Sequence, residues 1–330
     1  MNLNFEIDPA SSQTKLQQLI HAINEAISNG LLKEGDLLPS VNQLSRQCGV
    51  SRDTIFKAYS VLKQRSIVSS TPTKGYFVNS LSFKVMVLLD DFSAFKEQFY
   101  NSFRSNLPAN YTVDLLFHHY NHDIFDQLIL NSLGRYSMYV VMNFNNQRIE
   151  EVVKKIDPNK LLILDMGTPN SPDIAYITQD FTLGVLDCLR EAFPRIRKYS
   201  EFHLVFPETL LHPKEFVHSF SYFCSSNKLK HSLIRKIDEY PVKAGQAFLV
   251  IREDDLVCII RQCRDKGLEP GKDVGLISYN DTPMKEIVGN GITTISVDFK
   301  EMGLKAARFI ESKEKIFEVL APRLILRGSL

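Results

Sequence analysis

The residues with the clearest chemical potential are a serine and an arginine, Ser51 and Arg52, at the start of a predicted helix. The serine hydroxyl and the free backbone amides at a helix start suit phosphate oxygens, and an arginine can read the edge of a guanine base in the major groove. The surrounding stretch 40–75 holds six Lys and Arg residues against a single acid, Asp53, in a chain whose formal net charge is +1. A basic block of this kind is typical of a nucleic-acid-binding module. The alternative is a solvated helix face on which Arg52 pairs with Asp53 or Asp36.

The sequence around this pair predicts three helices followed by a β-hairpin. The first helix ends at Asn29-Gly30, and the second lies between Ser40, which can cap it, and Gly49. A helix, a glycine turn and a helix form a helix-turn-helix, whose second helix enters the major groove. Two short runs, 67–70 and 75–78, flank a turn and predict the hairpin. The residues expected on the buried side of the helices are Leu16, Leu19, Ile20, Ile23, Ile27, Val41, Leu44, Cys48, Ile55, Phe56, Tyr59 and Leu62.

Four short sequences in this segment form a recognisable pattern. They are G-x-L-x-x-G-D-x-L-P-S-V at Gly30–Val41, V-S-R-x-T at Val50–Thr54, A-Y-x-x-L at Ala58–Leu62 and K-G-Y-F-V at Lys74–Val78. Together they resemble the winged helix-turn-helix of GntR-type transcriptional regulators over about sixty-five residues.

The resemblance implies a DNA contact for residues of both helices and of the wing. Asn42 stands where the family usually has an arginine that contacts DNA, so we expect a different operator preference. The start of the recognition helix is expected to meet phosphates and base edges, and the wing is expected to approach the minor groove. The DNA-binding residues so predicted are Ser40, Asn42, Ser51, Arg52, Thr54, Lys57, Lys74 and Gly75.

Beyond residue 81, short apolar runs alternate with helical stretches. This alternation indicates parallel sheets with helices on both faces, and continuous Val, Ile and Leu runs indicate strands buried on both sides. The fold class is therefore α/β, with domain 1–80 followed by a two-lobed domain 81–330. The predicted strands are 84–90, 112–117, 139–144, 161–165, 175–180, 202–206, 247–251, 273–280 and 293–298. The predicted helices are 94–107, 123–133, 146–156, 181–193, 213–227, 254–266 and 300–311. The predicted lobes are 81–180 with 298–320 (lobe 1) and 181–297 with 321–330 (lobe 2).

Four sequences near the C-terminus carry a second resemblance. They are G-L-x-x-G-K-D-V-G-L-I-S-Y-N-D-T at Gly267–Thr282, I-T-T-I-S-V-D at Ile292–Asp298, M-G-x-x-A at Met302–Ala306 and R-L-I-L-R-G-S at Arg323–Ser329. They resemble the effector domain of LacI-type repressors, which is similar to periplasmic sugar-binding proteins. A GntR-type head on such a body is the arrangement of sugar-responsive repressors of the arabinose-repressor kind.

The second resemblance also implies ligand-binding positions between the lobes. Lys214 stands in place of an arginine, Arg252-Glu253 in place of an Asn-Asp pair, and Asn280-Asp281 in place of an Asp-Asp pair. The ligand-binding residues so predicted are Asp90, Asp91, Phe92, Lys214, Arg252, Glu253, Asn280 and Asp281. Because most of these types differ from those of the usual repressor, we expect a different ligand.

The chemistry of this set favours a polyol. Its side chains supply donors and acceptors for vicinal hydroxyls, and the Phe92 ring can cover an apolar sugar face. The set holds at least four acids against two basic residues, which disfavours a phosphate dianion. A nucleoside or sugar-phosphate effector is the alternative. Each acid has the simpler alternative of ending a strand or capping a helix, as do the weaker candidates Asp165 and Asp180.

The sequence thus predicts a repressor that binds a palindromic double-stranded DNA operator as a homodimer and responds to a monosaccharide. The rival is a winged helix fused to an enzyme such as an aminotransferase, whose body exceeds ~250 residues and needs a Schiff-base lysine. We find no such lysine context, and no GxSxG, GxxxxGK[ST] or GxGxxG motif, so neither enzyme activity nor a cofactor is expected.

Composition and short motifs exclude further classes. The histidines of 118–122 end a strand rather than lying on one helix face, so a polar loop at the cleft rim is preferred to a metal site. Hydrophobic residues make up 44% of the 330 residues, yet no apolar run approaches the ~20 residues of a membrane span. Five cysteines without a CxxC pair and the lack of a signal-peptide pattern predict a cytoplasmic protein with no membrane partner.

Overall fold

Side-chain caps set the limits of three N-terminal helices in the computed structural model, which describes residues 7–330 apart from 9–10, 12, 66, 80–82 and 144–150. Thr14 caps the first helix and Ser40 the second, each within a capping box completed by a glutamine. Gly49 ends the second helix in the left-handed conformation that favours glycine. The elements of this segment are α1 (Lys15–Ser28), α2 (Val41–Cys48), α3 (Arg52–Gln64), β1 (Val68–Thr71) and β2 (Gly75–Val78).

The three helices and the antiparallel β1–β2 hairpin share one apolar core. Ile55, Tyr59 and Leu62 are fully buried on α3, as the sequence predicts. The prediction for Phe56 is wrong, because its side chain is 55% exposed and Ala58 takes the buried position. Positions i, i+3, i+4 and i+7 form one helical stripe, and Phe56 lies about 100° away from that stripe.

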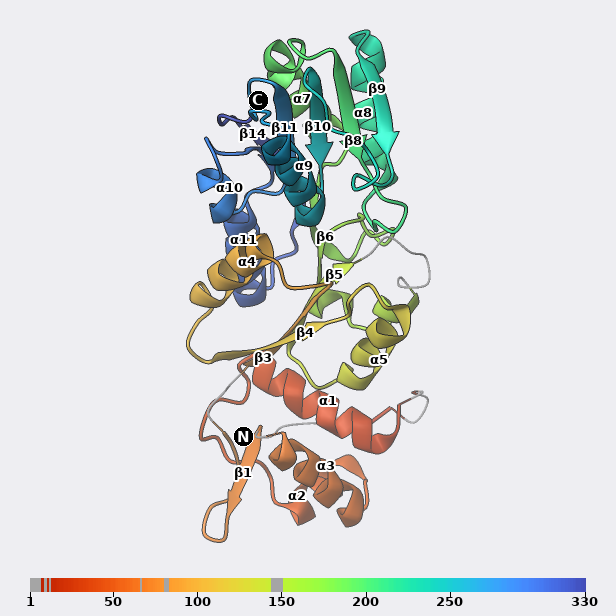
Figure 1. The fold of residues 1–330 in the computed structure, drawn as a ribbon. Helices are drawn as coiled ribbons and strands as arrows, with labels where there is room; N and C mark the ends of the chain where they lie inside the picture. Colours follow the sequence, from red (N-terminus) through yellow and green to blue (C-terminus); the bar gives the residue numbers. More distant parts are fainter. Residues whose placement is uncertain (1–6, 9–10, 12, 66, 80–82, 144–150) are drawn as a thin grey trace. The chain divides into compact units, whose positions relative to one another are not determined.

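The rest of the chain is built on two six-stranded sheets (Figure 1). Sheet 1 has the order β13-β7-β6-β5-β3-β4 and sheet 2 the order β14-β12-β11-β10-β8-β9. Sheet 1 contains β3 (Phe83–Leu89), β4 (Tyr111–Phe117), β5 (Met138–Asn143), β6 (Leu161–Asp165), β7 (Ala175–Gln179) and β13 (Phe317–Leu320). Sheet 2 contains β8 (Glu201–Val205), β9 (Lys230–Ile234), β10 (Gln246–Val250), β11 (Val274–Tyr279), β12 (Thr293–Ser296) and β14 (Arg323–Ile325). The strand pairs of sheet 2 are parallel except β12–β14, which is antiparallel.

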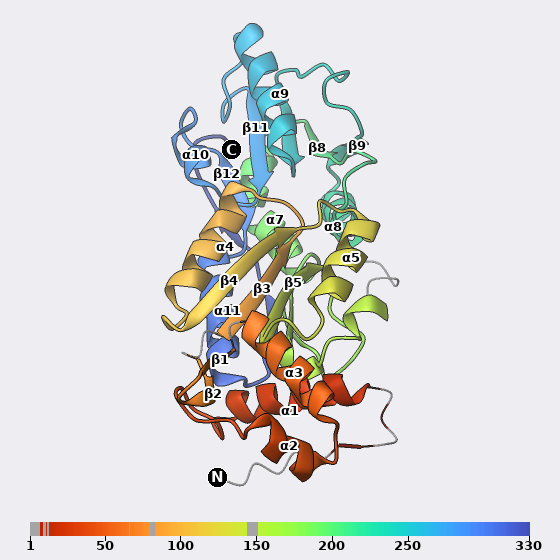
Figure 2. The same cartoon turned by 90° about the horizontal axis from the view of Figure 1, so that it is seen from below.

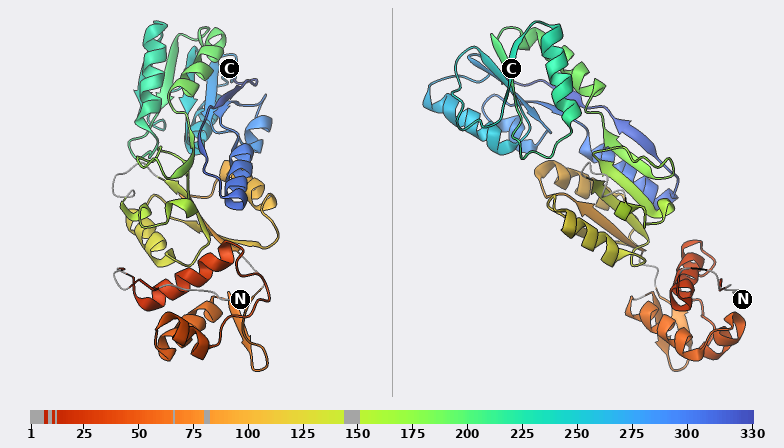
Figure 3. Two further views of the ribbon diagram at one scale, coloured as in Figure 1. Left: turned by 180° about the vertical axis from the view of Figure 1, so that it is seen from behind. Right: turned by 90° about the vertical axis from the view of Figure 1, so that its right-hand side faces the viewer.

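Helices cover both faces of each sheet, which explains the continuous apolar strands. Helices α4 (Ala94–Ser105) and α11 (Phe299–Ser312) pack together on one face of sheet 1, and α5 (His122–Ser132) lies on the other (Figure 2). On sheet 2, α7 (Leu183–Ile196) and α8 (Lys214–Ser226) lie opposite α9 (Glu253–Asp265) (Figure 3). The short helices η1 (Pro158–Lys160) and α10 (Pro283–Ile287) complete the set of named helices.

Every predicted strand that lies within the described residues is present, but β9, β13, β14 and α10 were not predicted from the sequence. These elements are short, and β9, β13 and β14 lie at sheet edges, where apolar runs are interrupted. Residues 146–150 of the predicted helix 146–156 lie outside the described residues, and residues 151–153 are helical as predicted. Among the described residues, no helix is both long and apolar enough to cross a bilayer.

The chain packs as two compact units, and both sheets contribute to the larger one. The smaller is Met1–Val87 with Pro108–Asp114 and Leu130–Tyr139, and the larger is Leu88–Leu107 with Leu115–Ile129 and Val140–Leu330. The chain passes from sheet 1 to sheet 2 after β7, returns after β12, and passes again between β13 and β14. The predicted boundary at residue 80 lies outside the described residues, and the lobe limits stay predictions.

Candidate functional site

The start of α3 presents an arginine that nothing in the described part of the chain engages. Ser51 Oγ accepts a hydrogen bond from the Thr54 amide (3.2 Å) and lies 2.8 Å from Thr54 Oγ1. Arg52 is exposed, and its guanidinium forms no hydrogen bond or ion pair with any described residue. Asp53 pairs with Lys57 instead (2.7 Å), and Asp36 accepts the Lys33 amide (2.8 Å). The alternative of a surface pair for Arg52 is therefore wrong.

The other predicted DNA-binding residues lie at the start of α2 and in the hairpin turn. Ser40 Oγ accepts the Gln43 amide (3.3 Å), so this hydroxyl caps α2, while Asn42 is exposed. In the hairpin, the Lys74 amide donates to Thr71 Oγ1 (3.2 Å) and the Lys74 side chain is exposed. Gly75 has φ +77° and open space around it. The structure places these residues on one folded segment, and their contact with DNA stays a prediction.

A buried ion-pair cluster occupies the carboxyl end of β3. Lys96 on α4 pairs with both Asp90 and Asp91. Burial would raise the pKa of Asp90, but the Lys96 ammonium and a hydrogen bond from Tyr120 hold that pKa below its usual range. Asp90 is 1% exposed and Lys96 3%, whereas the Asp91 side chain is 46% exposed. The predicted residues Asp90 and Asp91 are thus together, with one neutralising lysine between them.

A second polar cluster connects the two sheets within the larger unit. The Gln179 amide at the end of β7 donates to Asp165 at the end of β6, and Tyr279 at the end of β11 donates to Gln179 Oε1 over 2.8 Å. All three side chains are at least nine-tenths buried. Burial, with a smaller contribution from nearby Asp90, raises the pKa of Asp165 to about 6. Polar side chains from both sheets therefore meet at strand carboxyl ends, where ligands of α/β sheets bind.

The predicted ligand pair after β11 is Asn280-Asp281, and Asp281 is held by contacts within the fold. Asp281 forms a bidentate ion pair with Arg327 (2.7 and 2.9 Å) and accepts a hydrogen bond from Thr294 (2.9 Å). Burial would raise the pKa of Asp281, but the Arg327 and Thr294 hydrogen bonds hold it below its usual range. Asn280 adopts φ +61°, and its buried Oδ1 accepts no hydrogen bond from a described residue.

A buried lysine brings Glu253 close to this pair. Lys285 Nζ donates to the carbonyls of Tyr279 (3.1 Å) and Asn280 (2.7 Å), and it lies 3.8 Å from Glu253 Oε1. Burial lowers the pKa of Lys285 to about 8, although Glu253 and Asp281 act in the opposite direction. Four of the predicted ligand residues are thus held by cations that were not predicted from the sequence. Lys96 holds Asp90 and Asp91, Arg327 holds Asp281, and Lys285 lies near Glu253.

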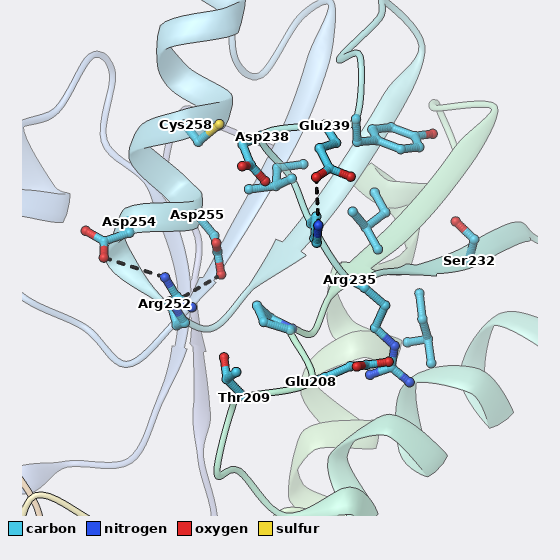
Figure 4. A pocket seen from close by; sticks show the side chains of 16 residues that line it. Glu208, Thr209, Ser232, Arg235, Asp238, Glu239, Arg252, Asp254, Asp255 and Cys258 are labelled. Atoms are coloured by element: carbon cyan, nitrogen blue, oxygen red, sulfur yellow. Dashed lines mark hydrogen bonds and ion pairs between the residues drawn. The ribbon is translucent and has the colours of Figure 1, made fainter.

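The remaining predicted ligand residues are more exposed. Phe92 is 55% exposed and its ring meets Phe117 edge-on, and Lys214 is exposed at the start of α8. Arg252, at the start of α9, is 3.6 Å from Asp254 and 3.7 Å from Asp255 and lines a cavity beside that helix (Figure 4).

Several residues with partners distant in the chain were not predicted from the sequence. Tyr279 and Arg327 lie within the motifs of the second resemblance, and Lys96, Gln179 and Lys285 lie outside them. No local pattern marks any of the five, because each acts through a partner placed by the fold. Gln179, Tyr279 and Arg327 lie at or near a strand end, whereas Lys96 and Lys285 lie on the helices that follow β3 and β11. With Lys96, Lys285 and Arg327 included, five basic residues accompany the four predicted acids, so the predicted excess of acid over base is gone.

The histidine segment before α5 is partly buried rather than a polar rim. His118 is fully buried, and its Nε2 lies 3.2 Å from the Met142 carbonyl. Burial lowers the pKa of His118 to about 4, which keeps the ring neutral at physiological pH. No group of His, Cys, Asp or Glu residues within the described ranges has metal-binding geometry.

Two family models match separate parts of the chain. Residues 15–78 match the family described as bacterial regulatory proteins, gntR family. Residues 174–330 match the periplasmic binding protein-like domain.

Curated relatives match about a fifth of the chain. A transcriptional regulator named YjiR from Escherichia coli K12 is 40% identical over 65 residues, which is 20% of this chain and 14% of that protein. The transcriptional repressor YtrA from Bacillus subtilis 168 is 32% identical over 74 residues, which is 22% of this chain and 57% of that protein. The chain thus spans less than two thirds of the length of either relative.

Solved structures match about three quarters of the chain. A trehalose repressor from Escherichia coli aligns with a TM-score of 0.62 at 12% identity, covering 74% of this chain and all of that one. A lac repressor dimer bound to operator and the anti-inducer ONPF aligns with a TM-score of 0.63 at 17% identity, covering 75% of this chain and 94% of that one. At these identities the likeness concerns the fold.

Proposed function

Because the chain joins a GntR-type helix-turn-helix to a periplasmic-binding-protein-like domain, we propose that it is a transcriptional repressor controlled by a small molecule. The single observation that carries the DNA-binding part is the start of α3. Its Ser51 cap is formed and its Arg52 guanidinium is exposed and unengaged among the described residues. An arginine in this position of a recognition helix is free to form two hydrogen bonds with guanine.

We propose that the protein binds as a homodimer to a palindromic operator. A single helix-turn-helix reads one half-site, and two half-sites about one helical turn apart need two heads related by symmetry. One of the similar solved structures, that of the lac repressor, is a dimer bound to its operator, and this supports the proposal.

The effector is proposed to bind between the predicted lobes, at the carboxyl ends of β3, β6, β7 and β11. The polar side chains of Asp91 and Asn280 offer acceptors there, and Asn280 also offers donors, that suit a hydroxylated ligand. A ligand that binds one arrangement of the lobes better than the other shifts the equilibrium by its differential affinity. The hydrogen bond between Tyr279 and Gln179 joins the two sheets, so its rearrangement is a means of transmitting binding.

The charge of this region does not separate a neutral sugar from a sugar phosphate or nucleoside. Lys96 offsets one of the two charges of Asp90 and Asp91, and Arg327 neutralises Asp281. We therefore keep a phosphorylated sugar or a nucleoside as the second candidate effector. For a phosphorylated sugar, Lys285 and Lys214 are the lysines proposed to supply positive charge to the phosphate group.

The test begins with DNA selection and continues with the effector. Selection from a random DNA pool by the full-length protein is expected to enrich a palindrome, and Arg52→Ala is expected to weaken the enrichment and to relax it at one position of each half-site. Thermal unfolding is then measured with neutral monosaccharides, sugar phosphates and nucleosides, since a ligand at about 100 times its Kd adds about 2.7 kcal/mol of stability. The stabilising compound should change operator affinity several-fold. A compound that stabilises the protein yet leaves operator affinity unchanged contradicts the control mechanism, and enrichment of no DNA contradicts the DNA-binding role.

A further inference from the structure

A second cavity, of about 280 Å³, lies at the amino ends of β11 and β12, beside the last turns of α9. Its volume is slightly below the range of about 300–1,000 Å³ of drug-sized sites, so it suits a small occupant. The six residues of β11, about 20 Å in length, separate it from the carboxyl ends of the strands, where the effector is proposed to bind. None of the residues predicted to bind the effector lines this cavity, so a ligand here is additional to the proposed effector.

Apolar side chains predominate among those that line the cavity. Ile260 and Cys263 come from α9, and Leu268 and Ile292 come from the loops that precede β11 and β12. Burial raises the pKa of the Cys263 thiol to about 11, so the thiol is neutral at physiological pH and acts as a small apolar group. These walls therefore suit the apolar part of a ligand.

One wall of the cavity is fixed by backbone segments that pack directly against one another. A Cβ added to Gly271 would overlap the Gly328 carbonyl oxygen, and a Cβ added to Gly328 would lie 2.5 Å from the Asn290 carbonyl oxygen. The Gly328 amide donates to the Asn290 carbonyl (2.9 Å), and the Leu276 amide donates to the Ser329 carbonyl (2.7 Å). Because these segments are already held in place, little entropy is lost in ordering them around a ligand.

The cavity also has a cation with no partner in the described part of the chain. Arg264, in the last turn of α9, is exposed, and its guanidinium forms no hydrogen bond or ion pair with any described residue. A cation is favourable at the end of a helix, but this leaves its N–H donors free. Glu269, the acid among the lining residues, lies 3.5 Å from Lys272, which offsets its charge. The unpaired charge at this cavity is therefore positive.

We propose that this cavity binds a small monocarboxylate with a compact apolar body, whose carboxylate accepts hydrogen bonds from Arg264 while its body packs against Ile260 and Leu268. A planar guanidinium donates two parallel hydrogen bonds to a carboxylate, and a single cation suits a monoanion better than a phosphate dianion. The apolar walls select against a free sugar, because hydroxyls buried without partners are unfavourable.

Isothermal titration of the full-length protein tests this with benzoate, benzyl alcohol and benzylamine, which share a phenyl ring and carry a carboxylate, a hydroxyl or an ammonium group. Benzoate is expected to bind with one site per chain, more tightly than benzyl alcohol by at least about tenfold, and benzylamine is expected to give no heat. Acetate keeps the carboxylate but lacks the ring, so it is expected to bind more weakly than benzoate by at least about tenfold. Absence of benzoate binding, or an affinity for benzyl alcohol or acetate equal to that for benzoate, overturns the proposal.

The variant Arg264→Gln removes the charge of an exposed side chain, so the fold is expected to be retained, with an unchanged unfolding temperature. It is expected to weaken benzoate binding by at least about tenfold. Arg261→Gln is the matched control, since Arg261 is an exposed arginine of the same helix that neither lines the cavity nor pairs with a described residue. Unchanged benzoate binding in Arg264→Gln, or an equal loss in Arg261→Gln, assigns the binding to another part of the protein or to general surface charge and refutes the site.

Discussion

The Tyr279 hydroxyl donates a hydrogen bond to Gln179 Oε1 over 2.8 Å, and both residues are buried at the carboxyl ends of strands in different sheets. The same glutamine uses its amide nitrogen to donate to Asp165. Gln179 is thus committed at both ends of its side chain, to one residue of its own sheet and to one of the other. A change in the separation of the sheets must break or re-form this bond.

Removing the hydroxyl in Tyr279→Phe is expected to lower the free energy of unfolding by about 1–3 kcal/mol, because it leaves a buried acceptor without its donor. Tyr139→Phe is the matched control, since Tyr139 is also buried and donates to the Ser132 carbonyl (2.7 Å) within the sheet-1 region. Urea unfolding should show a similar loss for both. Hydrogen exchange should increase at the ends of β7 and β11 only in Tyr279→Phe, and equal exchange patterns in the two variants would contradict a role in joining the sheets.

Asp165 gives the protein a pH dependence of defined sign. Its pKa is raised to about 6, above the usual value near 3.8, because burial disfavours the charged form. The folded state therefore binds more protons than the unfolded state between these values, and this group's contribution to stability falls as pH rises from about 4 to about 6.

Asp165→Asn keeps an acceptor for the Gln179 amide and suits the observed φ of +73°. The variant is expected to be more stable than wild type above about pH 6, by up to about 3 kcal/mol, and to lose that advantage below about pH 4. Urea unfolding across this range measures the difference. A gain that is constant with pH would show that ionisation of Asp165 is not its source.

Local sequence determined the N-terminal segment well, and the reason is physical. Ser40, Ser51 and Gly49 act on backbone groups within four residues, so a serine or glycine at a helix end is nearly sufficient evidence for the cap. Phe56 shows the limit, because an aromatic residue one position outside the stripe is exposed whatever its hydropathy. The alternation of strands and helices was predicted equally well from the sequence, because buried parallel strands have continuous apolar runs.

The ligand residues were less predictable because their state depends on partners far along the chain. Asp281 was a reasonable candidate as an acid after a strand, but Arg327, 46 positions later, holds it in a two-pronged pair. Asp90 is likewise neutralised by Lys96 on the following helix. Position at a strand end predicts where a side chain lies, whereas its freedom to bind a ligand depends on contacts that only the folded chain defines.

Two glycines, Gly49 at the end of α2 and Gly303 of the M-G-x-x-A motif, separate conformational strain from steric exclusion. Gly49 has φ +62°, and no atom of a described residue beyond its chain neighbours lies within 4 Å of the place that a Cβ would take. Gly49→Ala is therefore expected to cost only about 1–2 kcal/mol, for the left-handed conformation. At Gly303 on α11, an added Cβ would lie 2.4 Å from the Phe99 carbonyl oxygen on α4.

Gly303→Ala must therefore push α11 and α4 apart, which is expected to cost about 3 kcal/mol or more even though alanine favours a helix by about 1 kcal/mol. Thermal unfolding of the two variants measures the contrast. Equal losses, or a stable Gly303→Ala protein, would show that the helices adjust to the added methyl group without strain.

Arg52 and Lys57 lie five positions, or about 1.4 turns, apart on α3, and they are expected to affect DNA binding differently. Arg52 is proposed to read a base, so Arg52→Ala should weaken operator binding by about 1–3 kcal/mol and relax specificity at one position. Lys57 forms an exposed pair with Asp53, which is worth little and is easily exchanged for a phosphate. Lys57→Ala should weaken all sequences alike and reduce the slope of log affinity against log salt by about 1.

Fluorescence anisotropy on the selected palindrome and on scrambled DNA at several salt concentrations separates the two effects, with Arg197→Ala on the C-terminal end of α7 as a surface control. A base contact is lost on the palindrome alone, whereas a phosphate contact is lost on both DNAs. If Arg52→Ala weakens both DNAs equally, Arg52 contacts phosphate and the specificity of the protein resides elsewhere on α2, α3 or the wing.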